Sequence, residues 1–175
     1  MERELRENLF GDDAWMALEP SARTFIATAE KIFRDHRSDA AFDFAPVIGS
    51  LAKALEVTCN AILDEVAGSL PPEARRIRID DREMEVGGRR PLTLGQFARA
   101  VGGERTLNHA LAQRLEYGGW FVGNLPVIID NLLTVRNPGV HEQRIDRETA
   151  TRLRNQLVGV GCQGTFQELA RVRPR

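Results

Sequence analysis

Apolar residues recur every three or four positions along two segments in the first half of the chain. In residues 19–37 this stripe begins after Pro20, a residue suited to the first turn of a helix. In residues 44–67 the stripe is longer and stops before Pro71-Pro72. Such spacing places the apolar side chains on one face of a helix. The pattern therefore predicts two amphipathic helices, of which the second is the longer.

The periodicity then changes from helical to alternating. Polar and apolar residues alternate over 76–80 and 82–86, and Gly87-Gly88 follows. Alternation is the pattern of a half-buried strand, so these residues predict a small hairpin. Because two strands alone are marginally stable, we expect the hairpin to lean on the helices. Two short helices are expected after it, over residues 94–101 and 106–117, each stopped by a pair of glycines.

Helical periodicity returns in residues 120–136, which carry charge only at Asp130 and at the last position. We expect a central, buried helix here, kinked or delayed by Pro126. Asp146 is a good cap for a last helix over residues 147–160.

These elements predict one all-α domain over residues 1–175, a four-helix bundle. Its core is expected over about residues 19–160. The hairpin and the short helices form an insertion over about residues 71–118, between the second and third main helices. The chain is long enough to bury a core, and its composition, 42% hydrophobic and 28% charged, excludes a disordered protein.

Composition excludes several other classes of protein. The sequence lacks the run of about 18 apolar residues that a transmembrane helix requires, and its charged N-terminus has no signal-peptide core. Cys59 and Cys162 are too few for a disulfide framework or a structural zinc site, and we expect Cys59 to be buried. We therefore expect a cytoplasmic protein with reduced thiols and no membrane partner.

Charge is distributed unevenly along the chain, although the net charge is only -1. Residues 1–70 hold 7 basic and 13 acidic side chains, whereas residues 136–175 hold 8 basic and 4 acidic ones. A basic C-terminal quarter attracts phosphates. An ordinary solvated surface has the same composition, so both interpretations stay open.

A polar motif, Arg136-Asn137-Pro138-Gly139-Val140-His141, follows the third predicted helix. Proline disfavours the helical conformation of the residue before it, so we expect the helix to end or distort near Arg136. In a straight helix Arg136 and His141 would lie ~140° apart around the axis. A break at residues 137–139 would let His141 swing back beside Arg136.

An arginine, a histidine and an amide side chain together suit phosphodiester chemistry. Histidine moves a proton near neutral pH, and arginine binds a phosphate oxygen while remaining charged. Asn137 can hold an oxygen or orient the ring of His141. In RNA the 2′-hydroxyl serves as the nucleophile, so no metal or other cofactor is expected, and no metal-ligand spacing lies near the motif. The alternative is an ordinary helix cap with a surface histidine, and spacing alone does not decide.

Three further residues are candidates for a supporting role. Lys53 and Glu56 share one face of the second helix, where they either reach the Arg–His loop or form an ion pair that fixes packing. Asp130, expected to be buried, needs a partner. That partner is an arginine across the bundle or a dimer, or His141, whose proton affinity Asp130 would tune.

The order of these features resembles the HEPN superfamily of four-helix domains. The matching residues are Arg136, Asn137 and His141 of its Arg-Asn-x-x-x-His motif, together with residues 42–47, 51–56, 91–97 and 146–153. The resemblance covers about residues 20–160.

The resemblance implies a four-helix bundle that is usually dimeric. Catalytic members are metal-independent endoribonucleases whose two motifs meet at the dimer interface and leave 2′,3′-cyclic phosphate and 5′-hydroxyl ends. Carried over, His141 would act as general acid or base, Arg136 would stabilise the developing charge and Asn137 would position the substrate or the histidine. Members paired with a nucleotidyltransferase antitoxin often have a tyrosine two residues after the histidine, where this chain has Gln143.

The sequence thus leads to two functional hypotheses. The first is a HEPN-type endoribonuclease that acts on RNA as a homodimer, with an antitoxin or a larger toxin–antitoxin or antiphage defence system as partner. The second is a catalytically silent HEPN domain that serves for dimerisation, nucleotide sensing or the binding of a protein partner.

Overall fold

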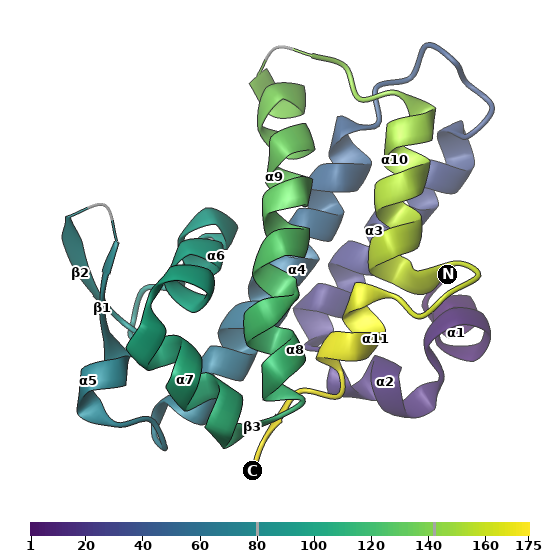
Figure 1. Ribbon diagram of the computed structural model, residues 1–175. Helices are drawn as coiled ribbons and strands as arrows, with labels where there is room; N and C mark the ends of the chain where they lie inside the picture. The colour runs from purple at the N-terminus through teal and green to yellow at the C-terminus, as the bar shows by residue number, and fades with distance from the viewer. Residues whose placement is uncertain (80, 142) are drawn as a thin grey trace.

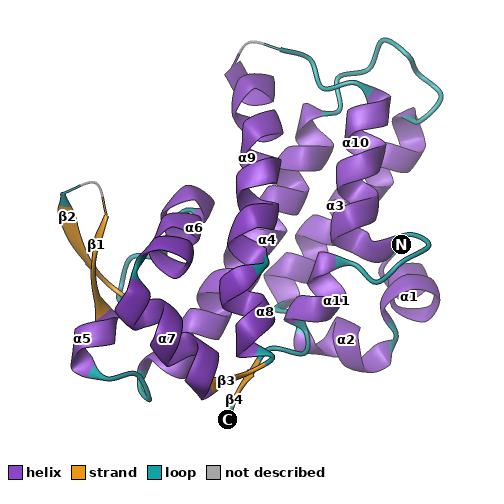
Figure 2. Ribbon diagram, in the orientation of Figure 1, coloured by secondary structure: helices purple, strands orange, loops and turns teal. Residues whose placement is uncertain are grey.

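We describe a computed structural model of residues 1–175, apart from Asp80, Glu142 and the side chains of residues 138–141. In this described part of the chain, four long helices form a bundle (Figures 1 and 2). They are α3 (Pro20–His36), α4 (Ala45–Ala67), α9 (Leu125–His141) and α10 (Arg147–Arg154), the last continued by the π-helical turn η2 (Asn155–Gly159). The predicted all-α class, with four main helices at these places, is confirmed.

The insertion between α4 and α9 contains the predicted hairpin. Its elements are α5 (Pro72–Arg75), β1 (Arg76–Ile79), β2 (Arg82–Glu85), α6 (Leu94–Gly103), α7 (Arg105–Arg114), β3 (Leu115–Glu116) and α8 (Gly118–Gly123). The strands β1 and β2 pair antiparallel, with Ile77 opposite Met84, and the apolar side chains of β1 are buried. Thr93 caps α6 in a capping box with Gln96.

The helix α7 ends earlier than predicted, because residues 115–116 leave the helix to form β3. Gly118 does not stop a helix but begins α8. A Cβ at Gly118 would lie 2.8 Å from the carbonyl oxygens of Leu111 and Ala112, so only glycine permits this close approach of α8 to α7.

Short terminal elements cover one end of the bundle. They are α1 (Glu2–Leu5), η1 (Arg6–Phe10), α2 (Asp12–Ala17), α11 (Thr165–Leu169) and β4 (Arg173–Pro174), which pairs antiparallel with β3. Trp15, Leu169 and Val172 are buried, so the hydrophobic core extends beyond residues 19–160 at both ends. The side chain of Gln167 donates a hydrogen bond to the carbonyl of Leu9 and joins the two terminal segments.

The helix α4 lies at the centre of the core and packs along α3. Among the described residues it is the one helix that could cross a membrane by length and composition. However, 56% of its apolar window is buried inside the protein, and the core helix of a bundle passes the same test.

A buried ion pair joins α3 to α10. The carboxylate of Glu30 is fully buried, and Arg154 donates to its two oxygens over 2.5 and 2.6 Å. The guanidinium carbon of Arg154 also lies 4.8 Å from the ring centre of Phe33. This pair fixes the position of the helix that follows the candidate motif.

The helix α9 is only half buried, which corrects the prediction of a central, buried helix. The predicted single helix over residues 120–136 is divided near Pro126: α8 ends at Gly123, and α9 begins at Leu125. The side chains of Ile129 and Leu132 face the core, whereas Val127 is 58% exposed.

Candidate functional site

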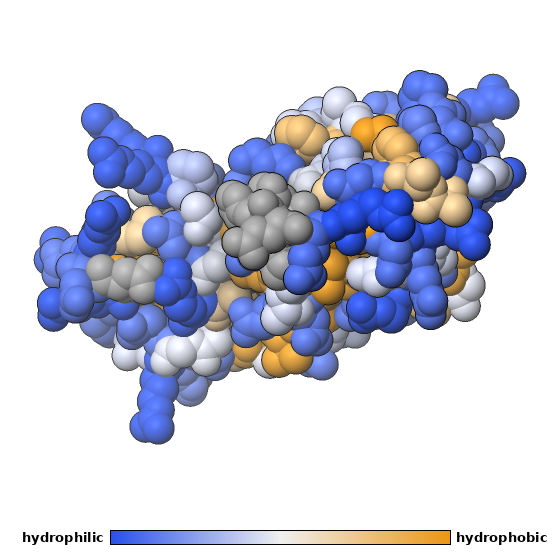
Figure 3. Space-filling model, turned by 90° about the horizontal axis from the view of Figure 1, so that it is seen from above, coloured by the Kyte–Doolittle hydropathy of each residue, from blue (hydrophilic) through white to orange (hydrophobic). Residues whose placement is uncertain are grey.

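The candidate motif lies at the end of the bundle where α9 finishes, at the top of Figure 1. Two connections meet here, one from α3 to α4 and the other from α9 to α10. The backbone of Phe44 bonds to that of Ile145, and one carboxylate oxygen of Asp43 accepts the N–H of Ile145 over 3.0 Å. Figure 3 looks down on this end, whose surface is mostly hydrophilic.

Arginines reinforce the contact between these two connections. Arg144 donates to the carbonyl of Ala41 over 3.2 Å, and Arg147 donates to that of Arg37 over 3.1 Å. Arg144, Ile145 and Arg147 are therefore held against the loop that precedes α4.

The helix α9 does not end near Arg136, so the predicted helix end is wrong. The helix continues to His141, four residues beyond Asn137. A proline removes one backbone hydrogen bond, here to the carbonyl of Thr134, and the preceding turns of α9 keep the helix formed. The unbroken backbone places Arg136 and His141 ~140° apart around the axis.

The structure places two of the three motif side chains. Arg136 is partly buried, and its Nε has no hydrogen-bond partner within the described part of the chain. Asn137 is exposed. The side chain of His141 lies outside the described residues, so the meeting of these three side chains stays a prediction.

Lys53 and Glu56 form the ion pair that the sequence offered as one alternative. The Nζ of Lys53 lies 2.6 Å from one carboxylate oxygen of Glu56. The other oxygen accepts the backbone N–H of Leu94 over 3.2 Å, so Glu56 helps to hold the start of α6. These contacts show a packing role between α4 and the insertion.

Asn60 completes this packing and was missed by the sequence analysis. Its side-chain oxygen accepts the N–H of Leu92 over 2.8 Å, and its nitrogen donates to the carbonyl of the same residue over 2.9 Å. Asparagine is a poor helix former, so its position in the middle of the long helix, one turn after Glu56, could have indicated a hydrogen-bonding role.

Asp130 is exposed, so the expectation of a buried acid is wrong. The reason is the orientation of α9, whose solvent face carries Val127, Asp130, Asn131 and Thr134. A carboxylate on this face is hydrated and needs no partner inside the bundle.

A cavity of about 280 Å³ lies beside the motif, between α9 and the start of α10. Thr134 and Val135 form one wall, and Arg144 and Asp146 contribute to the other. Asp146 caps α10 by accepting the N–H of Thr149 over 2.8 Å, and this hydrogen bond lowers the pKa of its carboxyl group. The cavity thus combines a fixed negative charge with a nearby arginine.

No protein-family model, curated protein or solved structure matches the chain. The site must therefore be interpreted from its own residues. Within the described residues, no group of three or more histidine, cysteine or acidic side chains is placed to hold a metal ion.

An aromatic stack stands at the same end of the bundle. The rings of His36 and Phe42 are parallel to within 2°, with their centres 3.8 Å apart, and Phe42 meets Phe44 edge-on at 5.0 Å. Aromatic rings beside arginines are a common surface for unpaired nucleotides.

Proposed function

We propose that this chain is a metal-independent endoribonuclease of the HEPN type, with Arg136 and His141 as its reacting residues. The observation that carries the proposal is the position of the motif. It occupies the end of the third helix of a four-helix bundle, shortly before the capped fourth helix. Arg136 is partly buried at this end of the helix, and its guanidinium is the group of the motif suited to bind a phosphate oxygen.

The proposed reaction is attack of an RNA 2′-hydroxyl on the adjacent phosphorus. A bond from the 2′-oxygen to phosphorus forms, the bond to the 5′-oxygen breaks, and the products are a cyclic phosphate and a 5′-hydroxyl. His141 takes the proton of the 2′-hydroxyl or gives one to the leaving 5′-oxygen. Arg136 stabilises the negative charge on the phosphorus oxygens, and Asn137 positions the substrate.

The unbroken helix favours a site shared between two copies of the chain. Positions 136 and 141 of a continuous helix lie ~140° apart around its axis, so one phosphate would be reached by Arg136 of one protomer and His141 of its partner. The solvent face of α8 and α9 suits such a contact. Residues 117–135 contain one charged residue, Asp130, and expose Val127.

The end of the bundle offers contacts for RNA next to the motif. His36 and Phe42 present a stack to which a base can add; Arg37 and Arg144 lie in the two connections, and Arg147 is the first residue of α10. Base stacking with backbone contacts is how proteins hold single-stranded RNA.

RNA cleavage in EDTA tests the proposal. The wild-type protein is compared with Arg136→Ala, His141→Ala and, as a control for loss of an exposed arginine, Arg152→Ala. We expect products with cyclic-phosphate ends from the wild type and the control, and none from the other two variants. Cleavage that survives both motif substitutions refutes the proposal.

Mixing the two inactive variants tests the shared site. A heterodimer of Arg136→Ala and His141→Ala contains one complete site, so an equal mixture should recover about a quarter of wild-type activity. A site confined to one chain recovers none.

The continuous backbone of α9 is also compatible with the second hypothesis, a catalytically silent domain that binds a partner, because positions 136 and 141 lie on different sides of one helix. Absence of cleavage from a wild-type protein that still binds single-stranded RNA or forms a dimer would support this function instead.

A further inference from the structure

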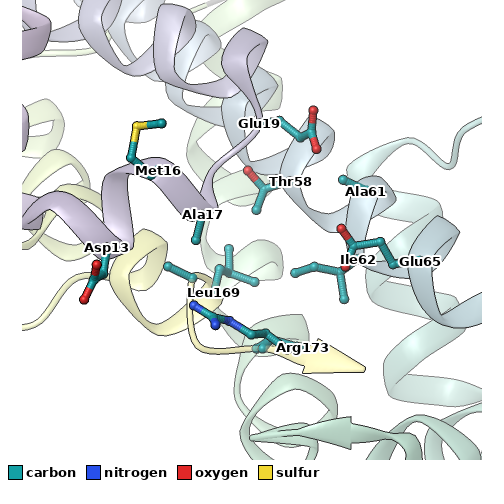
Figure 4. Close-up of a pocket in the computed structure, with 12 residues that line it drawn as sticks. Asp13, Met16, Ala17, Glu19, Thr58, Ala61, Ile62, Glu65, Leu169 and Arg173 are labelled. Atoms are coloured by element: carbon teal, nitrogen blue, oxygen red, sulfur yellow. The ribbon is translucent and has the colours of Figure 1, made fainter. Parts of the chain in front are cut away.

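The end of the bundle where α2 and α11 lie, opposite the motif in Figure 1, carries a cavity of about 570 Å³, whose lining Figure 4 shows. Its walls come from α2, from the second half of α4 and from the segment that joins α11 to β4. No part of the proposed ribonuclease mechanism uses this cavity.

The floor of the cavity is apolar. Ile62, Leu169 and Val172 lie at its base and are 7%, 1% and 4% exposed. Met16 stands at the rim and is 61% exposed, more than any other large apolar side chain among the described residues. An incoming apolar side chain would remove Met16 from water, and methionine adapts its shape to such contacts.

The rim of the cavity is acidic. Asp13, Glu19 and Glu65 line it together with one cation, Arg173. Figure 4 shows Glu19 and Glu65 on the α4 side, with the guanidinium of Arg173 across the opening. None of these four side chains forms a salt bridge within the described part of the chain.

A buried threonine also lines the cavity. Thr58 is 5% exposed, and its hydroxyl donates to the carbonyl of Ala54 over 2.9 Å. The lone pairs of this oxygen remain able to accept a hydrogen bond from a cationic group at the rim.

The acidic surface continues along α4 into a second hollow of about 430 Å³. Glu19, Ala61 and Glu65 line both hollows, so the two are adjacent, and we call them together the acidic groove. The second hollow adds the carboxylates of Glu56 and Asp64, and it contains Lys53, which is paired with Glu56. Lys53 and Glu56, candidates for supporting the motif, thus line this groove instead.

We infer that the groove binds a segment of a partner polypeptide in which basic and apolar side chains alternate. Charge complementarity argues for this occupant: five carboxylates line the groove against two cations, one of them already paired. The apolar floor favours a ligand that also carries apolar side chains, which a simple polycation does not have. The basic groups bind Glu19 and Glu65, and the apolar ones fill the space between Met16 and Ile62.

Fluorescence anisotropy with labelled ten-residue peptides at low salt tests the inference. The probes are an alternating Lys-Leu peptide, a Lys-Ser peptide and a Glu-Leu peptide, each added to the full chain. We expect the Lys-Leu peptide to bind at least about tenfold more tightly than the others. The double variant Glu19→Gln/Glu65→Gln should weaken it about tenfold, because each carboxylate contributes a modest attraction.

The matched control is Glu83→Gln/Glu85→Gln, which removes two exposed carboxylates from β2, outside the groove. This control should bind the Lys-Leu peptide like the wild type. Three results would overturn the inference: equal binding of the Lys-Ser peptide, equal loss in the control, or no binding of any peptide. Displacement by spermidine with no preference for leucine would identify a polyamine site, and self-association lost in the groove variant would identify a second copy.

Discussion

Removing Arg154 should destabilise the protein far more than removing an exposed cation from the same bundle. Glu30 is fully buried, and both of its carboxylate oxygens accept hydrogen bonds from Arg154. Breaking one side of a buried pair typically costs about 3–5 kcal/mol. In Arg154→Met a partial partner remains, because the Nε of Arg34 lies 3.8 Å from Glu30, so we expect about 3 kcal/mol.

Urea denaturation followed by circular dichroism measures this loss. Lys31→Met is the control, because Lys31 pairs with Asp35 on the exposed side of α3, and its removal should leave the midpoint nearly unchanged. The double variant Glu30→Met/Arg154→Met removes both charges and should be more stable than Arg154→Met alone. A loss below about 1 kcal/mol in Arg154→Met, or a still less stable double variant, would refute the role given to this pair.

Three further predictions concern the backbone, a helix cap and the cysteines. Gly159 has a φ of +88° and would place a Cβ 2.6 Å from a backbone nitrogen, so Gly159→Ala should unfold at lower urea than Gly161→Ala, where φ is also positive but the space is open; equal midpoints would contradict this. Asp146→Ala should lower the melting temperature at pH 7, because the hydrogen bond to α10 lowers the pKa of Asp146. This difference should shrink progressively as the pH falls below about 4, since the stabilisation is lost on protonation; a difference that does not shrink with acidification would exclude the charge as the cause. A thiol reagent should modify Cys162 in the native protein and Cys59 only in urea, because burial raises the pKa of Cys59; two fast thiols in the native state would show that α4 opens.

The sequence predicted the four long helices and the hairpin because their signals are local. The stripes in α3 and α4, the alternation around Ile77 and the cap at Asp146 each involve residues within a few turns of one another. These elements form as predicted because the conformation that the local sequence favours is also the one that buries its apolar side chains.

The terminal layer could not be predicted, because its elements are too short to show a period. The helices α1 and α2 span four and six residues, and β4 spans two. Their order depends on burial of side chains such as Trp15 and Val172 against distant parts of the chain.

Only part of the candidate site could be predicted from sequence. The capping oxygen of Glu56 meets Leu94, 38 positions away, and no local pattern records that contact. The exposure of Asp130 depends on how α9 is turned toward its neighbours. The conformational restriction that Pro138 places on Asn137 favoured a helix end, but the helix already formed by the preceding residues continues through it.

The hydrogen bond from Gln167 to Leu9 has a consequence for the order of events in folding. It closes a loop of 158 residues, whereas eight residues, 37–44, connect α3 to α4. The longer loop exceeds the shorter by roughly four doublings of length, so closing it costs about 2.5 kcal/mol more in conformational free energy. The α3–α4 hairpin should therefore form early, and the terminal layer should dock late and detach first. Because that layer walls the acidic groove, a bound segment would slow its detachment, and amide exchange in α2 and α11 would report occupancy of the groove.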